Sequence, residues 1–509
     1  MKIFHFDFNT AFYNRPYLEK FIRRLKSWNY DTLLWELEDF VRWDHLAFCG
    51  QSDSISKDEM AEILRFAESL GMDNIPLLQC LGHCEYVLSK PEYAHLADAP
   101  GQTAPYCPTN PEVRKFLKEL LTEYMELFHR SSYIHLGCDE VWRLGDQCPS
   151  CQAAIAAKGK AELLADHINF LNDVVNAAGK EAMIWADMLL IHPHGVTNLA
   201  KNIIMVDWRY ELRDDRKKLW LWDEKGGRLI DETEITGDMR ENFGKYLYKD
   251  GRLNIFYTTD FLLDHGFRVV TAGASACYPD NFLLGKTVDH VYNACAMMRK
   301  GVECFGYLHT SWTVHLFDYE LQPAIAAVRP TEDCAAVLEE YARKYFDIPG
   351  KRFFELCTML EPRILFAAAG STGSGKEVKE PPENIVSRRL KEYQQAGTLA
   401  DELAAARAQG ERFAEALAGL RELRKSVTRN EELFDRYILA AEALVNRAAF
   451  GVMAASEQLR LEHGIDRGAV EAEMRRLRAC YRKICGERLT PEHADRTVRI
   501  LFDTLLEYF

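Results

Sequence analysis

Long apolar runs are missing from this chain of 509 residues. A helix that spans a bilayer needs about 18 or more apolar residues in succession, and no such stretch occurs. The opening segment MKIFHFDFNTAFYNRP also lacks an apolar run long enough for a signal peptide. We therefore expect no membrane partner and a cytoplasmic location, where the 14 cysteines stay reduced.

An excess of positive charge is missing as well. The formal net charge is −14, whereas a protein that follows nucleic-acid phosphates presents a basic surface. We therefore expect no nucleic-acid partner. Hydrophobic residues make up 48% and charged residues 28%, which is an ordinary globular balance that can fill a large core.

Residues 1–345 repeat a short apolar run, a loop and an amphipathic helical stretch. Eight strands that alternate with helices predict parallel βα units, and this number fits a closed (β/α)8 barrel of the TIM type. The alternative is an open doubly wound sheet, but no Gly-rich nucleotide turn follows the first strand. The predicted strands cover residues 2–8, 32–37, 74–79, 133–137, 182–186, 202–208, 267–273 and 304–310.

The composition changes near residue 350. From there the chain is rich in Ala, Leu, Glu and Arg with helical periodicity, and no strand-like alternation stands out. We therefore predict two domains. Residues 1–345 would form the catalytic barrel, and residues 346–509 a C-terminal all-helical domain with a flexible loop near 370–384.

Two adjacent carboxylates follow the fourth predicted strand, in the segment HLGCDEVWRLG (135–145). In a barrel enzyme the site lies at the C-terminal ends of the strands, where Asp139 and Glu140 would stand. Two neighbouring carboxylates repel each other, which suits one of them to act as a general acid. The alternative is that the pair only caps the next helix.

Tryptophans recur at other predicted strand ends, namely Trp185, Trp208 and Trp312, and Asp187 and Tyr210 follow closely. A tryptophan usually belongs to the core, but three at one rim could stack against a pyranose ring. The C–H faces of a sugar pack on aromatic rings, and its hydroxyls need polar groups nearby.

The segment HLGCDEVWRLG resembles the signature of glycoside hydrolase family 20, the β-N-acetylhexosaminidases, in particular the hexosaminidase D-like branch. Further segments are similar in the same order over about residues 1–325: HFDF, LWELED, LLQCLGHCEYVL, CPTNPE, IWADML and TSW. The resemblance implies a retaining, substrate-assisted mechanism, which is an exception to the two-carboxylate scheme. It implies that the 2-acetamido oxygen of the substrate attacks the anomeric carbon and forms an oxazolinium intermediate.

The same resemblance implies roles for individual residues. Glu140 would be the general acid and base, and Asp139 would hold the acetamido N–H and stabilise the oxazolinium charge. His83, in LGHCEY, is expected to support Glu140 through a hydrogen bond. Tyr278 resembles the residue that donates to the acetamido oxygen, and Asp280 resembles a sugar-hydroxyl ligand, although YPDN also fits an ordinary turn.

The sequence departs from the family at two points. No arginine follows the first strand, where many members bind the sugar hydroxyls, and no acidic residue stands two positions after Trp312. Asp7, Glu38 or Glu320 could bind these hydroxyls instead. The choice between GlcNAc and GalNAc, which differ at O4, therefore stays open.

Two motifs imitate other kinds of site. Cys148-Pro-Ser-Cys151 could be half of a zinc site or a redox pair, with Cys138 as a third ligand, but no second CxxC is present. Gly370–Lys376 imitates a phosphate loop, yet Glu377 stands where the motif needs Ser or Thr. We favour free or loosely paired thiols and a flexible loop, and expect no metal and no cofactor.

The leading hypothesis is an exo-β-N-acetylhexosaminidase that releases terminal β-linked GlcNAc or GalNAc from small glycosides or glycan fragments. One alternative is a conventional glycosidase that acts on a sugar without an acetamido group. Another is a catalytically silent barrel that only binds carbohydrate. Apolar faces on the helical tail leave a homodimer open.

Overall fold

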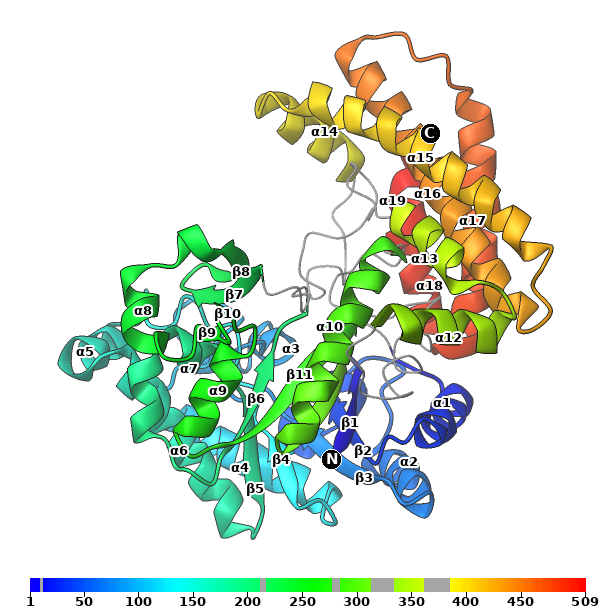
Figure 1. Ribbon diagram of the computed structural model, residues 1–509. Coiled ribbons are helices and arrows are strands. Elements are labelled where there is room, and N and C mark those ends of the chain that lie inside the picture. Colours follow the sequence, from blue (N-terminus) through cyan, green and yellow to red (C-terminus); the bar gives the residue numbers. More distant parts are fainter. Residues whose placement is uncertain (10–11, 211–216, 277–283, 313–333, 361–384) are drawn as a thin grey trace. The chain divides into compact units, whose positions relative to one another are not determined.

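A computed structural model describes residues 1–509 except 10–11, 211–216, 277–283, 313–333 and 361–384. Eight strands close into a barrel in the order β1-β12-β11-β6-β5-β4-β3-β2 (Figure 1). The predicted (β/α)8 barrel and its eight strand segments are therefore confirmed. The barrel strands are β1 (Lys2–Asp7), β2 (Thr32–Glu36), β3 (Asp73–Leu77), β4 (Tyr133–His135), β5 (Glu181–Trp185), β6 (Ile204–Trp208), β11 (Arg268–Ala276) and β12 (Gly306–Ser311).

Neighbouring strands of the barrel pair in parallel from β12 through β1 to β6 and on to β11. The register places Phe6 opposite Trp35 and Leu34 opposite Ile75. The strands are buried along nearly their whole length, as expected for a parallel sheet covered on both faces.

Helices follow most of the strands and cover the barrel. Helix α4 begins where the sequence predicts, because the Asn110 side chain accepts the N–H of Glu112 at 2.9 Å and Pro111 occupies the first turn. Helix α2 begins with a capping box of Ser56 and Glu59. The helices up to the last barrel strand are α1 (Arg15–Ser27), α2 (Lys57–Ser69), α3 (Glu85–Leu88), α4 (Pro111–Leu127), α5 (Pro149–Lys158), α6 (Lys160–Ala177), α7 (Asp187–Ile191), α8 (Gly237–Phe243), α9 (Tyr257–Asp264) and α10 (Leu284–Glu303).

Two short hairpins lie between β6 and α9. One pairs β7 (Lys218–Asp223) with β8 (Gly226–Asp231), and the other pairs β9 (Tyr248–Lys249) with β10 (Arg252–Leu253). The sequence did not single out these strands. The first hairpin brings two tryptophans, Trp220 and Trp222, into the fold.

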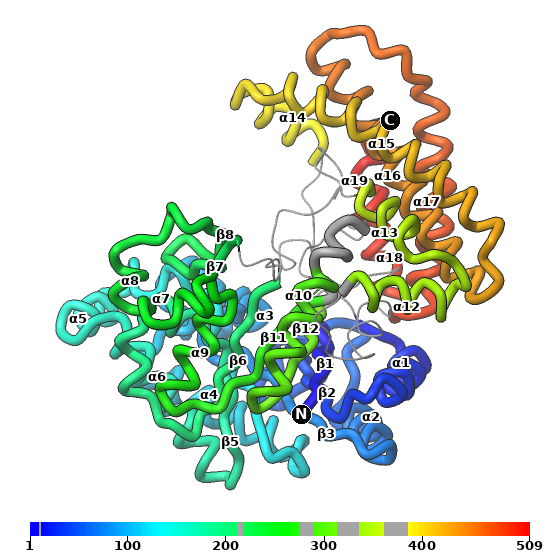
Figure 2. The backbone as a smooth tube through the Cα atoms, viewed as in Figure 1, coloured from blue at the N-terminus to red at the C-terminus, as the bar shows by residue number. Residues whose placement is uncertain are grey.

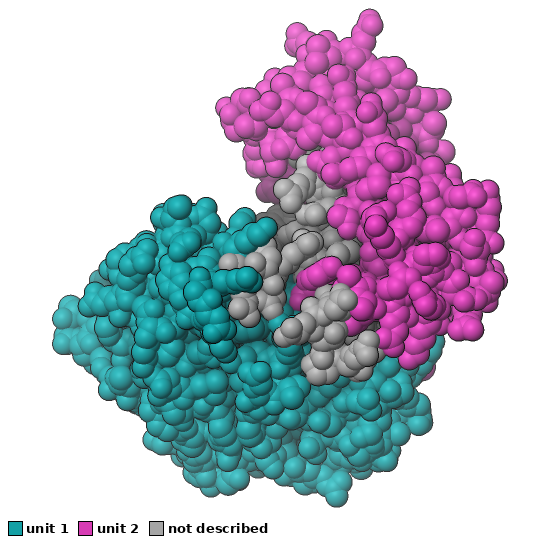
Figure 3. All heavy atoms as spheres, viewed as in Figure 1, with its two compact units in different colours: residues 1–9, 19–274, 293–310 teal, residues 10–18, 275–292, 311–509 magenta. Residues whose placement is uncertain are grey.

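The chain divides into two compact units, drawn in teal and magenta in Figure 3. Unit 1 comprises residues 1–9, 19–274 and 293–310, and unit 2 comprises residues 10–18, 275–292 and 311–509. The domain boundary at residue 345 stays a prediction, and the loop at 370–384 lies outside the described residues.

Described residues after 333 are helical where they form regular elements (Figure 2). Helix α15 packs against α16, and α16 packs against α17. These elements are α12 (Cys334–Phe346), α13 (Gly350–Met359), α14 (Ile385–Gln395), α15 (Leu399–Arg424), α16 (Glu431–Leu459), α17 (Arg467–Arg488), α18 (Pro491–Val498) and α19 (Thr504–Leu506).

Helix α16 is the one helix in the described part of the chain that is long and apolar enough to cross a membrane by length and composition. Of its most apolar window, 72% is buried inside the fold. Packing against α15 and α17 accounts for this apolar character, since the core helix of a folded domain passes the same test.

Candidate active site

The predicted site residues of unit 1 come from loops at one end of the barrel. Because the strands run in parallel, their carboxyl ends meet at the same rim. His83 follows β3, Asp139 and Glu140 follow β4, and Asp187 begins α7 two residues after β5 ends. The fold therefore brings together residues that are more than 100 positions apart in the sequence.

The turn after β4 presents the two carboxylates. Gly137, Cys138 and Glu140 all have positive φ values, of 65°, 74° and 52°. A non-glycine residue in this region is strained, so the surrounding structure must hold the turn in place. The result is that the Asp139 side chain points into the protein and is 7% exposed, while the Glu140 side chain is 39% exposed.

His83 connects the two carboxylates. Its Nε2 lies 3.3 Å from Asp139 Oδ2 and 3.3 Å from Glu140 Oε2. The residue before it, Gly82, lies against the turn of residues 137–140, which we call the catalytic turn because it carries the two candidate acids. A Cβ at Gly82 would stand 2.4 Å from the carbonyl oxygen of Asp139. The sequence predicted that His83 supports Glu140, and the structure places it between both acids.

Asp187 is fully buried and binds the backbone of the turn that carries Asp139 and Glu140. Its Oδ2 accepts the backbone N–H of Glu140 at 2.9 Å, and its Oδ1 accepts the indole N–H of Trp208 at 3.2 Å. Burial raises the pKa of Asp187 to about 8, and the charges of Asp139 and Glu140 add to this increase. The sequence predicts that Asp187 binds substrate, and this stays a prediction; in the structure its carboxylate contacts the backbone of Glu140.

One oxygen of Asp139 has no protein partner. Oδ2 faces His83, but Oδ1 is buried and accepts no hydrogen bond within the described residues. A buried acceptor without a donor is costly, so such an atom is suited to a ligand N–H.

Aromatic rings extend from Asp187 along this side of the site. Trp208 stacks on Tyr210 with ring centroids 5.0 Å apart and meets Trp222 edge to face at 4.4 Å. Trp222 also stacks on Trp142, which stands two residues after Glu140, at 6.4 Å. Sequence analysis missed Trp222, although the alternating WLW of strand β7 marked a possible hairpin.

The remaining predicted ligands occupy different places. Asp7 ends β1 and Glu38 follows β2, and both side chains are buried. Trp185 is 1% exposed and packs on His135 with ring centroids 4.5 Å apart. Trp312 follows β12 and is half-buried. Tyr278, Asp280 and Glu320 lie outside the described residues.

A polar network inside the barrel supports the catalytic turn, and the sequence analysis did not find it. Glu36 contacts His5 Nε2 at 3.1 Å and accepts the amide of Gln79 at 3.0 Å. Gln79 lies against Gly137, since a Cβ there would stand 1.9 Å from its Oε1. The signal was present as charged or imidazole side chains, His5 and Glu36, inside otherwise apolar strands.

Among the described residues, one group of side chains could hold a metal ion, and it includes neither Asp139 nor Glu140. It comprises Asp98, Cys107, Cys148 and Cys151. The first two belong to the segment between β3 and α4, which also carries His83, and the last two stand at the start of α5.

Parts of this chain are similar to known proteins. Residues 37–232 match the family model described as "Glycosyl hydrolase family 20, catalytic domain". The chain is 28% identical over 193 residues to Hexosaminidase D of Bos taurus, which covers 37% of this chain and 56% of that protein. It is also 27% identical to Hexosaminidase D of Homo sapiens over 222 residues. This match covers 41% of this chain and 45% of the human protein.

The chain thus spans about half the length of the curated relatives that it matches. Among solved structures it is similar to the chitobiase of Flavobacterium johnsoniae. That similarity has 16% identity and a TM-score of 0.49, and it covers 99% of this chain and 78% of that one.

Proposed function

We propose that the barrel of this chain belongs to glycoside hydrolase family 20, whose catalytic-domain model matches residues 37–232, and that the protein is an exo-acting β-N-acetylhexosaminidase. It would release terminal β-linked GlcNAc or GalNAc by a retaining, substrate-assisted mechanism. The names Hexosaminidase D of its curated relatives support this proposal.

The observation that carries the proposal is the shared contact of Asp139 and Glu140 with one nitrogen of His83. A conventional retaining glycosidase places its nucleophile and its acid on opposite sides of the scissile bond, about 5–5.5 Å apart. Two adjacent carboxylates that contact the same imidazole nitrogen lie on the same side of the scissile bond. This arrangement favours a nucleophile supplied by the substrate.

In the first step, the carbonyl oxygen of the 2-acetamido group attacks C1 of the sugar. The bond from C1 to the leaving oxygen breaks, and Glu140 gives its proton to that oxygen. Glu140 is suited to this role because its side chain is the more exposed of the pair and can reach the leaving group.

Asp139 acts on the acetamido group during the same step. Its free Oδ1 accepts the N–H and orients the carbonyl oxygen toward C1, and its charge stabilises the positive charge of the oxazolinium. In the second step, Glu140 takes a proton from water, the water oxygen bonds to C1, and the acetamido group is restored with retained configuration.

The aromatic rings of Trp142, Trp208, Tyr210 and Trp222 support a role in sugar binding. Trp142 and Trp208 are half-buried and stand beside the acid residue and its backbone partner. Such rings pack on the C–H face of a pyranose, which increases the affinity for a sugar without selecting a particular hydroxyl. Trp185, Trp312, Asp7 and Glu38 stay proposed substrate ligands.

The discriminating test uses nitrophenyl β-GlcNAc and β-GalNAc together with a thiazoline analogue of the oxazolinium. We expect hydrolysis of at least one acetamido substrate and strong competitive inhibition by the thiazoline. Hydrolysis of nitrophenyl glucoside without thiazoline inhibition would instead support a conventional glycosidase. Binding of GlcNAc without turnover of any glycoside would support a silent carbohydrate-binding barrel.

The ratio of the GlcNAc and GalNAc rates gives the preference at O4. A cytoplasmic location, substrates that are small glycosides or glycan fragments, and a homodimer remain predictions from the sequence. The cytoplasmic location is compatible with the described cysteines, which form no disulfide, because free thiols are the expected state in a reducing compartment.

A further inference from the structure

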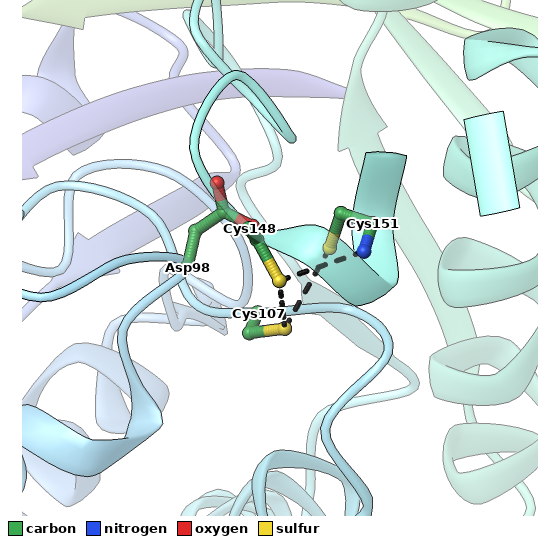
Figure 4. Close-up of side chains that lie close together, drawn as sticks. All are labelled: Asp98, Cys107, Cys148 and Cys151. Carbon is green, nitrogen blue, oxygen red and sulfur yellow. Dashed lines mark hydrogen bonds between the residues drawn. The ribbon is translucent and has the colours of Figure 1, made fainter. Parts of the chain in front are cut away.

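Three thiols and one carboxylate converge in unit 1 near the start of α5 (Figure 4). The Sγ of Cys107 lies 3.7 Å from that of Cys148 and 3.6 Å from that of Cys151. The ligand atoms of these cysteines and of Asp98 all lie within 4.8 Å of one another, and all four residues are buried.

The sulfur separations fit a tetrahedral metal site. Zinc–sulfur bonds of about 2.3 Å place two sulfurs of a tetrahedron about 3.8 Å apart. A disulfide requires about 2.05 Å, so the thiols are not bonded to one another in this structure.

Backbone pairing prepares the first two ligands before any ion binds. Ala97 and Tyr106 form an antiparallel bridge, so Asp98 and Cys107 are diagonal neighbours on one face of this pair. The N–H of Asp98 donates to Pro105 at 3.0 Å, and the N–H of Cys107 donates to Leu96 at 3.0 Å. These bonds hold both side chains in place on a rigid loop.

The other two ligands belong to the first turn of α5. Cys148 is the N-cap residue, and its sulfur accepts the N–H of Cys151 at 3.5 Å. The spacing of three residues directs both thiols to one side of the helix start. The positive end of the helix dipole also favours thiolates at this position.

Buried thiols alone could be explained as small apolar groups packed with Leu163 and Ile155. Asp98 does not fit that explanation. Asp98 is 3% exposed, its Oδ2 accepts the N–H of Gly145 at 3.0 Å, and its other side-chain partner within the described residues is the thiol of Cys151, whose proton a bound cation would replace. A carboxylate among thiols is costly unless a cation or a donor compensates it.

We propose that Asp98, Cys107, Cys148 and Cys151 bind one Zn²⁺ ion in a closed, structural site. The three thiols give up their protons to solvent on binding, and Asp98 supplies the fourth ligand through an oxygen. With four protein ligands the ion has no open position for a substrate, so its role is to stabilise the fold rather than to catalyse a reaction.

Hydroxyl groups around the sulfurs form the outer layer of the site. Thr109 Oγ1 lies 3.2 Å from the sulfur of Cys107 and 3.3 Å from that of Cys151, and Ser150 Oγ lies 3.1 Å from that of Cys148. Hydroxyls that donate to thiolates orient them and disperse the negative charge of a site with three sulfurs.

The ion would join the two loops that carry the candidate catalytic residues. Asp98 and Cys107 lie on the segment after β3 that includes His83, and Cys148 stands eight positions after Glu140 in the segment after β4. A bond between these segments restricts the distance between His83 and the two acids. Zinc therefore helps to position His83, Asp139 and Glu140 without contacting the substrate, and this role does not depend on which sugar binds.

The sequence alone favoured free thiols at Cys148 and Cys151 because no second CxxC exists. The structure supplies the missing ligands from Asp98 and Cys107, the latter 41 positions before Cys148. The third thiol is not Cys138, which instead donates to the carbonyl of Leu136.

The test begins with the metal content of the full-length protein, produced with zinc in the medium and purified without chelators. Mass spectrometry of the metals should find about one zinc per chain. Zinc below about a tenth of an ion per chain, in folded protein, would overturn the proposal. A disulfide between any two of Cys107, Cys148 and Cys151 in freshly purified protein, found by alkylation and peptide mapping, would also overturn it.

Two variants and a matched control assign the ion to this site. Cys151→Ser and Asp98→Asn should lower the zinc content at least about fivefold, whereas Cys485→Ser, which changes another buried cysteine far along the chain, should leave it unchanged. Equal zinc content in all three proteins would place the ion elsewhere and contradict the proposal.

Cobalt exchange gives a readout that does not depend on how well the variants fold. Wild-type protein loaded with Co²⁺ should show the thiolate-to-cobalt charge-transfer band and the visible bands of tetrahedral cobalt. Spectra of octahedral cobalt without the charge-transfer band would contradict a site with three sulfurs. Because none of these measurements uses a glycoside, their outcome is independent of the proposed enzymatic activity.

Discussion

The buried carboxylate of Asp187 accepts the backbone N–H of Glu140 at 2.9 Å, so the proposed acid is held by a group that is itself ionisable. Burial raises the pKa of Asp187 to about 8, far above the ordinary aspartate value of 3.8. In the unfolded chain Asp187 loses its proton near the ordinary aspartate pKa of 3.8, whereas in the folded protein it keeps the proton to about pH 8. This difference makes the stability of the fold depend on pH.

We expect Asp187 to destabilise the protein as the pH rises. The folded state binds the proton of Asp187 more tightly than the unfolded chain does. The contribution of this group to the free energy of unfolding is therefore fully present below about pH 4 and is lost as the pH rises toward about 8. Asp187→Asn should therefore reduce the loss of melting temperature between pH 5 and pH 9. The control is Asp173→Asn, which changes an exposed aspartate, and an equal pH dependence in wild type and Asp187→Asn would contradict this assignment.

Glu140→Gln removes the proton that the leaving group needs. We expect kcat on nitrophenyl substrates to fall about 10²–10⁴-fold, the usual contribution of general acid–base catalysis. The loss should be smaller for a dinitrophenyl leaving group, which departs with little protonation. The exposed Glu112→Gln is the control, and an equal loss for both leaving groups would argue against Glu140 as the acid.

Asp139→Asn keeps the size of the side chain but replaces one acceptor oxygen with a donor. The acetamido N–H would then lose its acceptor and the oxazolinium its countercharge, so we expect kcat to fall about 10²–10³-fold. Affinity for the thiazoline analogue should fall in parallel with kcat. Unchanged thiazoline binding in the variant would show that Asp139 does not hold the acetamido group.

Gly82→Ala tests whether the loop that carries His83 must lie against the catalytic turn. The added Cβ would stand 2.4 Å from the carbonyl oxygen of Asp139, which forces the turn or the loop to move. We expect destabilisation of about 1–3 kcal/mol and a fall in kcat of up to about 10²-fold. Gly237→Ala, where a Cβ meets nothing within 4 Å, is the matched control and should behave as wild type.

Removal of the proposed zinc should destabilise the barrel before it affects the chemistry. A strong chelator should lower the melting temperature by about 5–10 °C, because a bound structural ion contributes its binding free energy to folding. Zinc in excess over the chelator should restore the wild-type value. Cys151→Ser should already melt at the lower temperature and should not respond to the chelator.

The barrel could be predicted from the sequence because its strands and helix starts are marked by short local sequence patterns. Apolar segments such as TLLWEL and AMIWA read as buried strands, and Asn110 with Pro111 marks a helix start, which the structure confirms. The hairpin of β9 and β10 escaped notice because each strand is only two residues long, whereas β7 and β8 have six residues each and were not recognised despite the alternating WLW. Tyr278, Asp280 and Glu320 stay predictions, since they lie outside the described residues.

The sequence by itself determined that Asp139 and Glu140 stand together after a strand, since adjacency in the chain and the end of an apolar run are both local. Only the tertiary structure decided what surrounds them. Asp187 reaches the N–H of Glu140 across 47 positions, and Asp98 meets three cysteines that no local pattern groups with it. Such contacts depend on the closure of the barrel, which brings the ends of separate parallel strands to one rim.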